Sequence, residues 1–203
     1  MANTAAELLA KLLANPRVRV GDPLAVQTKL YGIVDAGFEK LLVISDFDHT
    51  LSAHLKNGVR NSTSHGVFEI NPNPERYGFT KEWQQEITSV CKKYLQIEFC
   101  PVMSVKEKIP HMVDWWEYSH RRLIDTKFTR DTVRRIALEA KIALRENAIT
   151  FLRCVDTCNV PIILFSAGIG DVISAILKNE MGEQLPRSLH IVSNMMIYDE
   201  KAS

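Results

Sequence analysis

Three short apolar runs, each containing β-branched residues, constrain the fold of this chain more than any other feature of its sequence. They occupy residues 40–45, 161–165 and 189–193, and helical patterns separate them. Runs of this length that lack polar alternation are typical of buried strands in a parallel sheet. Strands that alternate with helices predict an α/β fold. We expect helices on both faces of this sheet, because the first run has no polar side to turn toward water.

The rest of the chain shows mainly helical periodicity. Apolar spacing predicts helices at about 4–14, 23–36, 80–94, 105–125, 130–145, 146–158 and 169–179. Residues 56–79 are rich in Asn, Gly, Ser and Pro and predict a long loop of the kind that forms lids or linkers. A mostly helical insertion therefore follows the first strand. We predict a core made of residues 1–55 and 144–203, and a helical cap made of residues 56–143.

Two carboxylates come directly after the first strand. They are Asp46 and Asp48, within the stretch Asp-Phe-Asp-His-Thr. Carboxylates this close repel each other, and a hard divalent cation such as Mg²⁺ relieves the repulsion. One of them can then attack phosphorus while the other handles the proton, which splits a phosphoryl displacement into two steps through an aspartyl-phosphate. The alternative is a pair of aspartates that caps a helix or forms a turn.

A second polar stretch follows the second strand, where Ser166, Ala167 and Gly168 precede a predicted helix. The serine hydroxyl can bind an anion, and the small residues after it let backbone N–H groups approach the same oxygen atoms. A helix N-terminus adds partial positive charge. The alternative is an ordinary serine N-cap followed by glycine. Because parallel strands end at a common edge of the sheet, we expect this stretch to face the two aspartates.

These stretches resemble those of the haloacid dehalogenase-type phosphohydrolases. The sequences Asp-Phe-Asp-x-Thr-Leu-Ser and Phe-Ser-Ala-Gly-Ile-Gly-Asp-Val are similar, within that group, to those of the cytosolic 5′-nucleotidase III family, the pyrimidine 5′-nucleotidases. The likeness continues through residues 94–98, 107–116, 119–120 and 192–194, and it covers most of residues 25–200. It implies a Rossmann-like haloacid dehalogenase core, built on a parallel sheet, with an inserted helical cap.

The resemblance also implies a role for each polar residue at the two strand ends. Asp46 would be the nucleophile and Asp48 the general acid/base. The Mg²⁺ cofactor would sit on the Asp46 carboxylate and the main-chain carbonyl of Asp48. Ser166 and Ala167 would hold the phosphate of the substrate.

In the cap, the resemblance implies that Glu98 and Ser119 meet the nucleoside of a nucleoside 5′-monophosphate, such as CMP, UMP or, in some members, 7-methyl-GMP. Trp115 lies four residues before Ser119 and shares its helix face, so its indole can stack on a base. Two alternatives stay open. Trp115 can belong to the core, as we expect for Trp116, and Glu98 can be a solvated turn residue.

The chain ends at Ser203. The family continues with a lysine that neutralises the transferring phosphoryl group and with an Asp-containing loop that completes the Mg²⁺ site. We therefore expect an incomplete core. The alternative function is a catalytically impaired product that binds nucleotide or phosphate without turnover, because phosphoryl transfer depends on positioned charge.

Composition bounds the remaining function classes. Twenty-five basic and 24 acidic residues give a net charge of +1, which favours neither a nucleic-acid polymer nor an acidic membrane surface. Apolar runs fall short of the roughly 20 residues that a membrane span needs. The four cysteines form no C-x-x-C pair, so we expect them to be reduced. The N-terminal segment lacks a basic leader, and we expect a cytoplasmic monomer.

Overall fold

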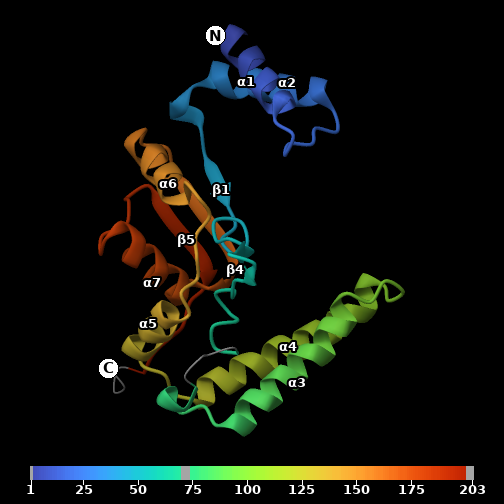
Figure 1. Ribbon diagram of the computed structural model, residues 1–203, viewed down its shortest axis with the longest axis vertical. Helices are drawn as coiled ribbons and strands as arrows, with labels where there is room; N and C mark the ends of the chain where they lie inside the picture. The colour runs from blue at the N-terminus through green and yellow to red at the C-terminus, as the bar shows by residue number, and fades with distance from the viewer. Residues whose placement is uncertain (1, 70–73, 200–203) are drawn as a thin grey trace.

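A computed structural model describes residues 2–69 and 74–199 of the chain (Figure 1). Its main sheet is parallel and has three strands, β1 (Val43–Ser45), β4 (Ile162–Ile169) and β5 (Leu189–Asn194), in the order β1-β4-β5. Ser45 pairs with Leu164, and Phe165 pairs with Val192. The predicted α/β class and the parallel sheet are confirmed.

Helices pack on one face of this sheet and at its two ends. Helices α6 (Ala148–Thr157) and α7 (Gly170–Met181) flank β4 in the chain. The core lies between the sheet and α7, where Leu164, Ile173 and Leu177 are fully buried. Helices α1 (Ala2–Ala14) and α2 (Pro23–Ala36) pack on each other at one end of the molecule, and the short 3-10 helix η1 (Phe38–Lys40) leads into β1 (Figure 1).

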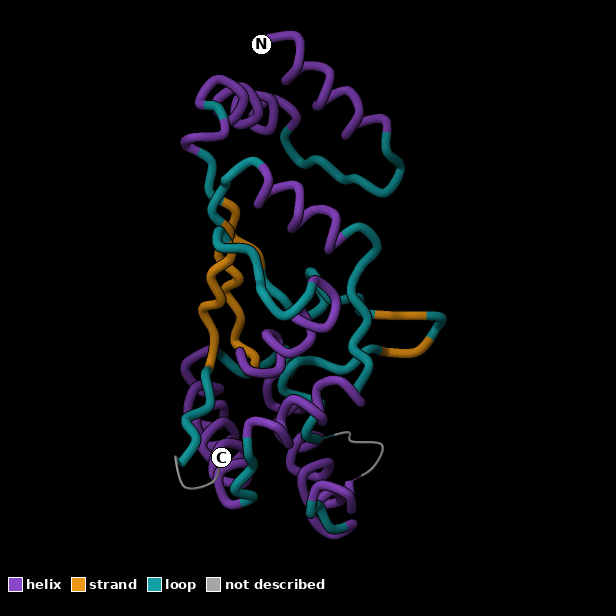
Figure 2. The backbone as a smooth tube through the Cα atoms, turned by 90° about the vertical axis from the view of Figure 1, so that its left-hand side faces the viewer, coloured by secondary structure: helices purple, strands orange, loops and turns teal. Residues whose placement is uncertain are grey.

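The other face of the sheet is open in the described part of the chain, so the expectation of helices on both faces is wrong. Ile44 is 65% exposed and Phe165 is 64% exposed, and both point to that face. Figure 2 shows the three strands nearly edge-on, with the helices of the core on one side of them. Strand β1 looked doubly buried because its residues are apolar on both faces. An apolar sequence shows which faces of a strand are suited to burial. In this structure helices cover only one face of the sheet.

The segment that leaves the sheet after β1 returns to it close to its starting point. Ser52 forms a β-bridge with Leu144, and the amide of Ala53 donates to the carbonyl of Ala143 over 2.8 Å. The side-chain amide of Asn61 donates to the carbonyl of Ala53 over 2.8 Å and to the carbonyl of Ala143 over 2.9 Å. The exit and return points are thus fastened together. The division into a core of 1–55 and 144–203 and a cap of 56–143 stays a prediction, and this junction supports it.

The start of this segment is not the featureless loop that its composition predicts. Strands β2 (Leu55–Lys56) and β3 (Val59–Arg60) form an antiparallel hairpin. The turn residues Asn57 and Gly58 have φ values of 53° and 78°, the left-handed region that Asn-Gly pairs adopt in two-residue hairpins. The Asn-Gly pair was therefore a signal for a hairpin that the loop interpretation overlooked.

After a turn over residues 64–69, the rest of the described segment is mainly helical. It contains the 3-10 helix η2 (Pro74–Tyr77) and the helices α3 (Lys81–Glu98), α4 (Val105–Asp125) and α5 (Arg130–Glu139). Helix α4 begins with a capping box, in which Ser104 and Glu107 satisfy each other's backbone amides. Helix α5 packs on α7, whereas α3 and α4 form an antiparallel pair that projects from the body (Figure 1).

One boundary of the predicted helices is wrong. Helix α4 runs over the predicted range and contains Pro110, six residues after the cap at Ser104. The helix predicted at 130–145 ends at Glu139, and Lys141 then takes a φ of 50°, which breaks the helical path.

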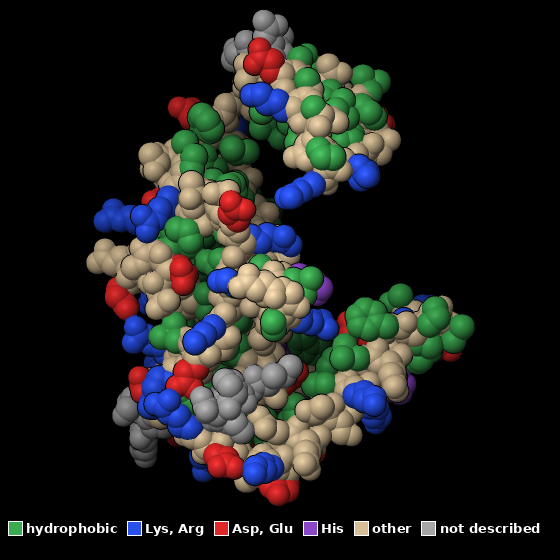
Figure 3. Space-filling model, viewed as in Figure 1, with side chains coloured by type: hydrophobic (Ala, Val, Ile, Leu, Met, Phe, Trp, Pro, Cys, Tyr) green, Lys and Arg blue, Asp and Glu red, His purple; other side chains and the backbone are tan. Residues whose placement is uncertain are grey.

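The projecting pair carries much of the exposed apolar surface. Figure 3 shows hydrophobic side chains gathered at its outer end and a hollow between it and helices α1 and α2. Phe99, Val102 and Val105 are exposed in this region. Across the described ranges, no helix combines the length and the apolar character that a membrane crossing requires.

Candidate active site

A tight turn after β1 places the two aspartates. Phe47, between them, is fully buried, and its carbonyl accepts from the amides of residues 50–52 over 3.2, 3.1 and 2.9 Å. Side chains alternate along an extended chain, so burying Phe47 turns Asp46 and Asp48 away from the core. Asp46 is accordingly exposed and Asp48 is half-buried. The apolar residue between the aspartates therefore fixes the direction of both carboxylates.

Main-chain contacts hold the far side of this turn. His49 has a φ of 62°, an uncommon conformation for a residue with a side chain. Its amide donates to the Ser52 hydroxyl over 2.8 Å. Arg145 donates to the carbonyl of His49 over 2.7 Å and to that of Thr50 over 2.8 Å. Arg145 lies just after the point where the inserted segment returns, so that junction also braces the turn.

The ends of β1 and β4 lie against each other, as the sequence predicts. A Cβ atom added to Gly168 would sit 2.9 Å from Oδ2 of Asp48. This distance is shorter than an ordinary van der Waals contact, so a side chain at position 168 would displace its neighbours. The acidic turn and the Ser-Ala-Gly stretch therefore lie side by side.

The Ser-Ala-Gly stretch is the last part of β4 and is fixed from within and from β5. The buried Ser166 hydroxyl accepts from the amide of Gly168 over 3.1 Å. Ser193 donates to the carbonyl of Gly168 over 2.8 Å, and Asn194 donates to that of Ala167 over 2.7 Å. Ala167 itself is exposed near the carboxyl end of β4, the central strand of the sheet. With both carbonyls engaged, the stretch is preorganised at the strand end where an anion would bind.

Asp48 lies in a different electrostatic environment from Asp46. Burial raises the pKa of Asp48 above its ordinary value, and the nearby charge of Asp46 raises it further. Two hydrogen bonds from Ser64 oppose this shift, because they stabilise the carboxylate. The hydroxyl of Thr50 donates to Oδ2 of Asp46 over 3.2 Å. The pair therefore offers one accessible carboxyl group and one partly buried carboxyl group with a raised pKa.

The oxygen atoms of this turn suit a hard cation such as Mg²⁺. The Asp46 carboxylate is accessible, and the amides of residues 50–52 bond to the carbonyl of Phe47 and not to that of Asp48. Mg²⁺ is commonly bound by one or two carboxylates and keeps several water ligands. Within residues 2–69 and 74–199, no group of three or more His, Cys, Asp or Glu side chains is placed to hold a metal ion. The turn thus presents a partial oxygen ligand set.

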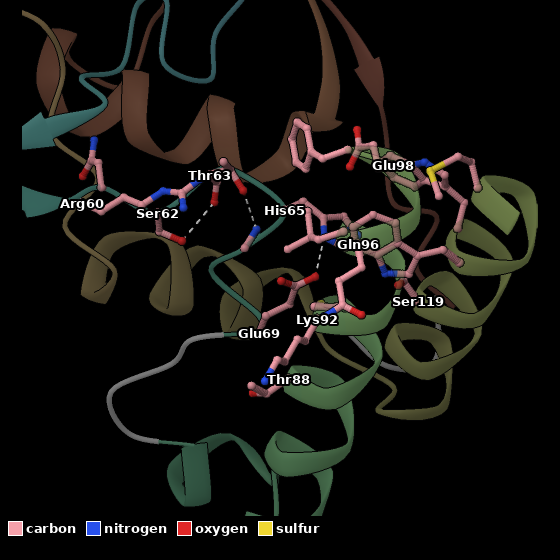
Figure 4. Close-up of a pocket in the computed structure, with 18 residues that line it drawn as sticks. Arg60, Ser62, Thr63, His65, Glu69, Thr88, Lys92, Gln96, Glu98 and Ser119 are labelled. Carbon is pink, nitrogen blue, oxygen red and sulfur yellow. Dashed lines mark hydrogen bonds and ion pairs between the residues drawn. The ribbon is translucent and has the colours of Figure 1, made fainter. Parts of the chain in front are cut away.

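A large pocket lies beside this turn, between helices α3 and α4 and the segment 60–69. Its volume is about 1060 Å³, at the upper end of the range for small-molecule sites. Glu98 and Ser119 both line it, as Figure 4 shows. Ser119 is buried on α4, and the exposed Glu98 ends α3. The two cap residues singled out from the sequence therefore share one cavity.

Aromatic rings form part of the pocket wall. Trp115 stacks on Tyr94 with 5.6 Å between ring centroids and 7° between ring planes. This pairing joins α3 to α4 and leaves Trp115 lining the pocket. The expectation that Trp116 belongs to the core is wrong, because its side chain is 39% exposed and also lines the pocket. Helix α4 projects from the body, so this part of its apolar stripe faces the pocket.

The pocket also contains ionisable groups that the sequence did not single out. Nδ1 of His65 lies 3.3 Å from Oε1 of Glu69 on the segment 60–69 (Figure 4). Cys91 lines the same region, and burial together with the charge of Glu69 raises the pKa of its thiol to about 12. His120 lines a neighbouring groove on α4 and not this pocket, with 6.4 Å between its ring centroid and that of His65. Burial lowers the pKa of His120, and the charge of His65 adds to this effect. The pocket is therefore apolar in its walls and carries separate polar groups.

The predicted site residues thus fall into two groups. Asp46, Asp48, Ser166 and Ala167 lie at the strand ends, whereas Glu98 and Ser119 line the pocket. The segment 60–69 connects the groups, because it lines the pocket and its Ser64 bonds to Asp48. Sequence reasoning missed this connection. Nothing in the spacing of Ser64 relates it to an aspartate 16 positions earlier.

Residues 49–203 match the sequence model of a family described as "Pyrimidine 5′-nucleotidase (UMPH-1)". The chain belongs to the pyrimidine 5′-nucleotidase family. The matched range begins immediately after Asp48, so it includes the Ser-Ala-Gly stretch and the pocket. The predicted family membership is confirmed.

Curated relatives and a solved structure agree with this assignment. The chain is 39% identical over 194 residues to "Putative cytosolic 5′-nucleotidase 3" of Caenorhabditis elegans, covering 95% of this chain and 50% of that protein. It is 35% identical over 188 residues to the human "7-methylguanosine phosphate-specific 5′-nucleotidase", covering 93% and 60%. The crystal structure of cytosolic 5′-nucleotidase IIIB bound to cytidine matches with a TM-score of 0.78 at 25% identity, over 95% of this chain and 63% of that one. The chain therefore spans half to less than two thirds of the length of these relatives.

Proposed function

We propose that this chain carries the nucleophile, the phosphate-binding strand end and the nucleoside pocket of a Mg²⁺-dependent 5′-nucleotidase. Its substrates would be nucleoside 5′-monophosphates such as CMP, UMP and 7-methyl-GMP. One observation carries the proposal: Oδ2 of Asp48 lies 2.9 Å from the place that a Cβ atom of Gly168 would take, so the acidic turn lies beside the Ser-Ala-Gly stretch. Family membership and the relatives' names support the reaction class.

In the first step, the Asp46 carboxylate attacks phosphorus and the bond between phosphorus and O5′ of the nucleoside breaks. Asp48 gives its proton to O5′, so the nucleoside leaves as a neutral alcohol. The raised pKa of Asp48 suits this role, because a carboxyl group with a raised pKa binds a proton more readily and can then donate it. In the second step, water attacks the aspartyl-phosphate and gives a proton to Asp48. Inorganic phosphate leaves, and both aspartates return to their starting states.

The strand ends would also hold the phosphate and the cofactor. The Ser166 hydroxyl and the main chain of Ala167 would hold phosphate oxygen atoms. The Asp46 carboxylate and the carbonyl of Asp48 would hold Mg²⁺, which supplies positive charge to the transferring phosphoryl group. The exposed Asp46 needs no rearrangement to become accessible to either group.

The pocket would hold the nucleoside. Its stacked Trp115 offers an aromatic surface for a base, and stacking on an indole tolerates both pyrimidines and purines. The Glu98 carboxylate would accept hydrogen bonds from the polar edge of the nucleoside, and the Ser119 hydroxyl would donate to it or accept from it. The crystal structure that matches this chain contains cytidine, according to its description, which supports the same ligand class here.

The test is phosphate release from CMP, UMP and 7-methyl-GMP with Mg²⁺, measured for the unmodified chain and for Asp46→Asn. We expect release that depends on Mg²⁺ and that falls at least 10³-fold in Asp46→Asn, because the nucleophile is removed. Asp35→Asn is the matched control, since Asp35 is an exposed aspartate on α2.

Two results would contradict the proposal. Equal turnover by Asp46→Asn and the unmodified chain would show that Asp46 is not the nucleophile. Calorimetric binding of CMP without phosphate release would favour the alternative function, a nucleotide-binding product that does not turn over its ligand.

A further inference from the structure

Ser64, on the segment inserted after β1, makes two hydrogen bonds to the same carboxylate. Its amide donates to Oδ1 of Asp48 over 2.8 Å, and its hydroxyl donates to Oδ2 over 2.6 Å. Ser64 is fully buried. Each oxygen atom of Asp48 therefore has its own donor, and both donors come from one residue 16 positions further along the chain.

Packing leaves Ser64 little freedom to move. A Cβ atom added to Gly168 would lie 1.8 Å from the Ser64 hydroxyl oxygen and 3.1 Å from the Ser64 Cβ atom. Ser64 thus fills the space that the missing side chain of Gly168 leaves open. Three residues earlier, Asn61 fastens the same segment to the main chain at Ala53 and Ala143. The donor pair is therefore anchored on the core and not on a free loop.

This arrangement fixes the rotation of the Asp48 carboxyl group. A carboxyl group turns about the bond between Cβ and Cγ, and this torsion has only a broad preference of its own. Two donors that occupy both oxygen atoms define its plane. Efficient proton transfer requires a defined donor geometry at the reacting oxygen, so the plane of this group affects the rate.

The geometry points to Ser64 as the positioning residue of the general acid/base. Ser64 would hold the Asp48 carboxyl group in the plane that delivers its proton to O5′ of the nucleoside. This inference rests on the proposed function. Ser64 transfers no proton itself: the bond between phosphorus and O5′ breaks, O5′ keeps the bonding electrons, and the proton comes from Asp48. A segment of the predicted cap would thereby orient an acid that the core strand supplies.

The test compares two substrates that differ in their need for an acid. CMP releases an alkoxide-like oxygen and needs a proton, whereas p-nitrophenyl phosphate releases a weakly basic phenolate and does not. The parameter kcat/KM reports steps up to the first irreversible one, so it isolates the phosphorylation of Asp46. We expect Ser64→Ala to lower kcat/KM for CMP by about 10- to 100-fold, and for p-nitrophenyl phosphate by less than about 3-fold.

Ser188→Ala is the matched control. Ser188 donates to Asp156 over 2.6 Å, the same length as the side-chain bond between Ser64 and Asp48, but it lies before β5 and away from the strand ends. It should leave kcat/KM for both substrates unchanged. Equal losses for the two substrates in Ser64→Ala would overturn the inference, because a merely structural role affects both.

A double-mutant cycle separates an effect through Asp48 from any other effect. In an Asp48→Asn background, Ser64→Ala should change kcat/KM for CMP by less than about 2-fold, since the acid is already absent. A full 10-fold loss in that background would contradict the inference. If Ser64→Ala does not fold, Ser64→Cys replaces it, because it keeps the amide donor and the side-chain volume while weakening the second bond.

A crystal structure of Ser64→Ala gives a result that does not depend on turnover. We expect the Asp48 carboxyl group to rotate or to occupy several orientations. An unmoved group would overturn the positioning role even if CMP is hydrolysed. Failure of the unmodified chain to release phosphate would instead refute the proposed function, so the two failures remain distinguishable.

Discussion

Replacing Gly168 with alanine tests the contact between the two strand ends most directly. The new Cβ atom would lie 1.8 Å from the Ser64 hydroxyl oxygen and 2.9 Å from Oδ2 of Asp48. An ordinary contact starts at 3.4 Å, so the hydroxyl must retreat by about 1.6 Å. A displacement of that size breaks its 2.6 Å bond to Asp48. Gly168→Ala therefore combines overpacking with the loss of a charge-assisted hydrogen bond.

The expected loss in the free energy of unfolding is about 2.5–6 kcal/mol. Overpacking contributes roughly 1–3 kcal/mol, and the hydrogen bond to a charged group contributes roughly 1.5–3 kcal/mol. Urea denaturation followed by circular dichroism measures the sum. Gly170→Ala is the control. Its Cβ atom would meet the sulfur of Met195 at 2.2 Å, but that side chain is exposed and flexible, so the cost should stay below about 1.5 kcal/mol.

A second variant identifies the clashing atom. Ser64→Ala removes the oxygen atom at 1.8 Å but leaves its own Cβ atom at 3.1 Å. The double variant should therefore be more stable than the sum of the two single losses predicts, by about 2 kcal/mol. Additive losses, or equal costs for Gly168→Ala and Gly170→Ala, would refute the claim that Ser64 occupies the space beside Gly168.

Three further predictions concern charge, reactivity and burial. Burial raises the pKa of folded Asp48 above its ordinary value of 3.8, so the folded state binds more protons than the unfolded state above that pH. Its contribution to stability therefore falls as the pH rises through this window, and Asp48→Asn should gain stability relative to the unmodified chain between pH 4 and pH 7 in urea titrations. Because burial raises the thiol pKa of Cys91 to about 12, iodoacetamide at pH 8 should alkylate it more slowly than the exposed Cys154, as peptide mass spectrometry would show. Ile44→Thr, on the open face of the sheet, should cost less than about 1 kcal/mol, whereas Ile162→Thr in the core should cost more than about 2 kcal/mol in the same denaturation assay.

Local patterns were sufficient to predict the strands and the acidic turn. Asp46 and Asp48 are placed by the strand before them and by Phe47 between them, so a short stretch of sequence contains the relevant information. Ser166 follows the same logic at the end of β4. Their proximity could be predicted because parallel strands end at one edge of a sheet.

Features that depend on distant parts of the chain could not be predicted in this way. The contact of Ser64 with Asp48 arises because the segment 60–69 folds back over the turn, and no spacing rule encodes that path. Trp116 lies on an apolar stripe that is typical of core residues, yet its helix projects from the body and turns it toward the pocket. Periodicity identifies which face of a helix is apolar, but not what covers that face.

The two aspartates share one turn but differ in what surrounds them. Asp46 is held by residues of the turn itself, whereas Asp48 is held by the segment inserted after β1. Asp46 depends on its own turn, since the hydroxyl that donates to it belongs to Thr50. Asp48 depends on the inserted segment, which buries it and supplies both of its side-chain hydrogen bonds. Under the proposed function, changes in the inserted segment should therefore alter proton donation by Asp48 while leaving Asp46 in place. The same changes would reach the pocket, because the segment 60–69 lines it and also carries Ser64, which bonds to Asp48.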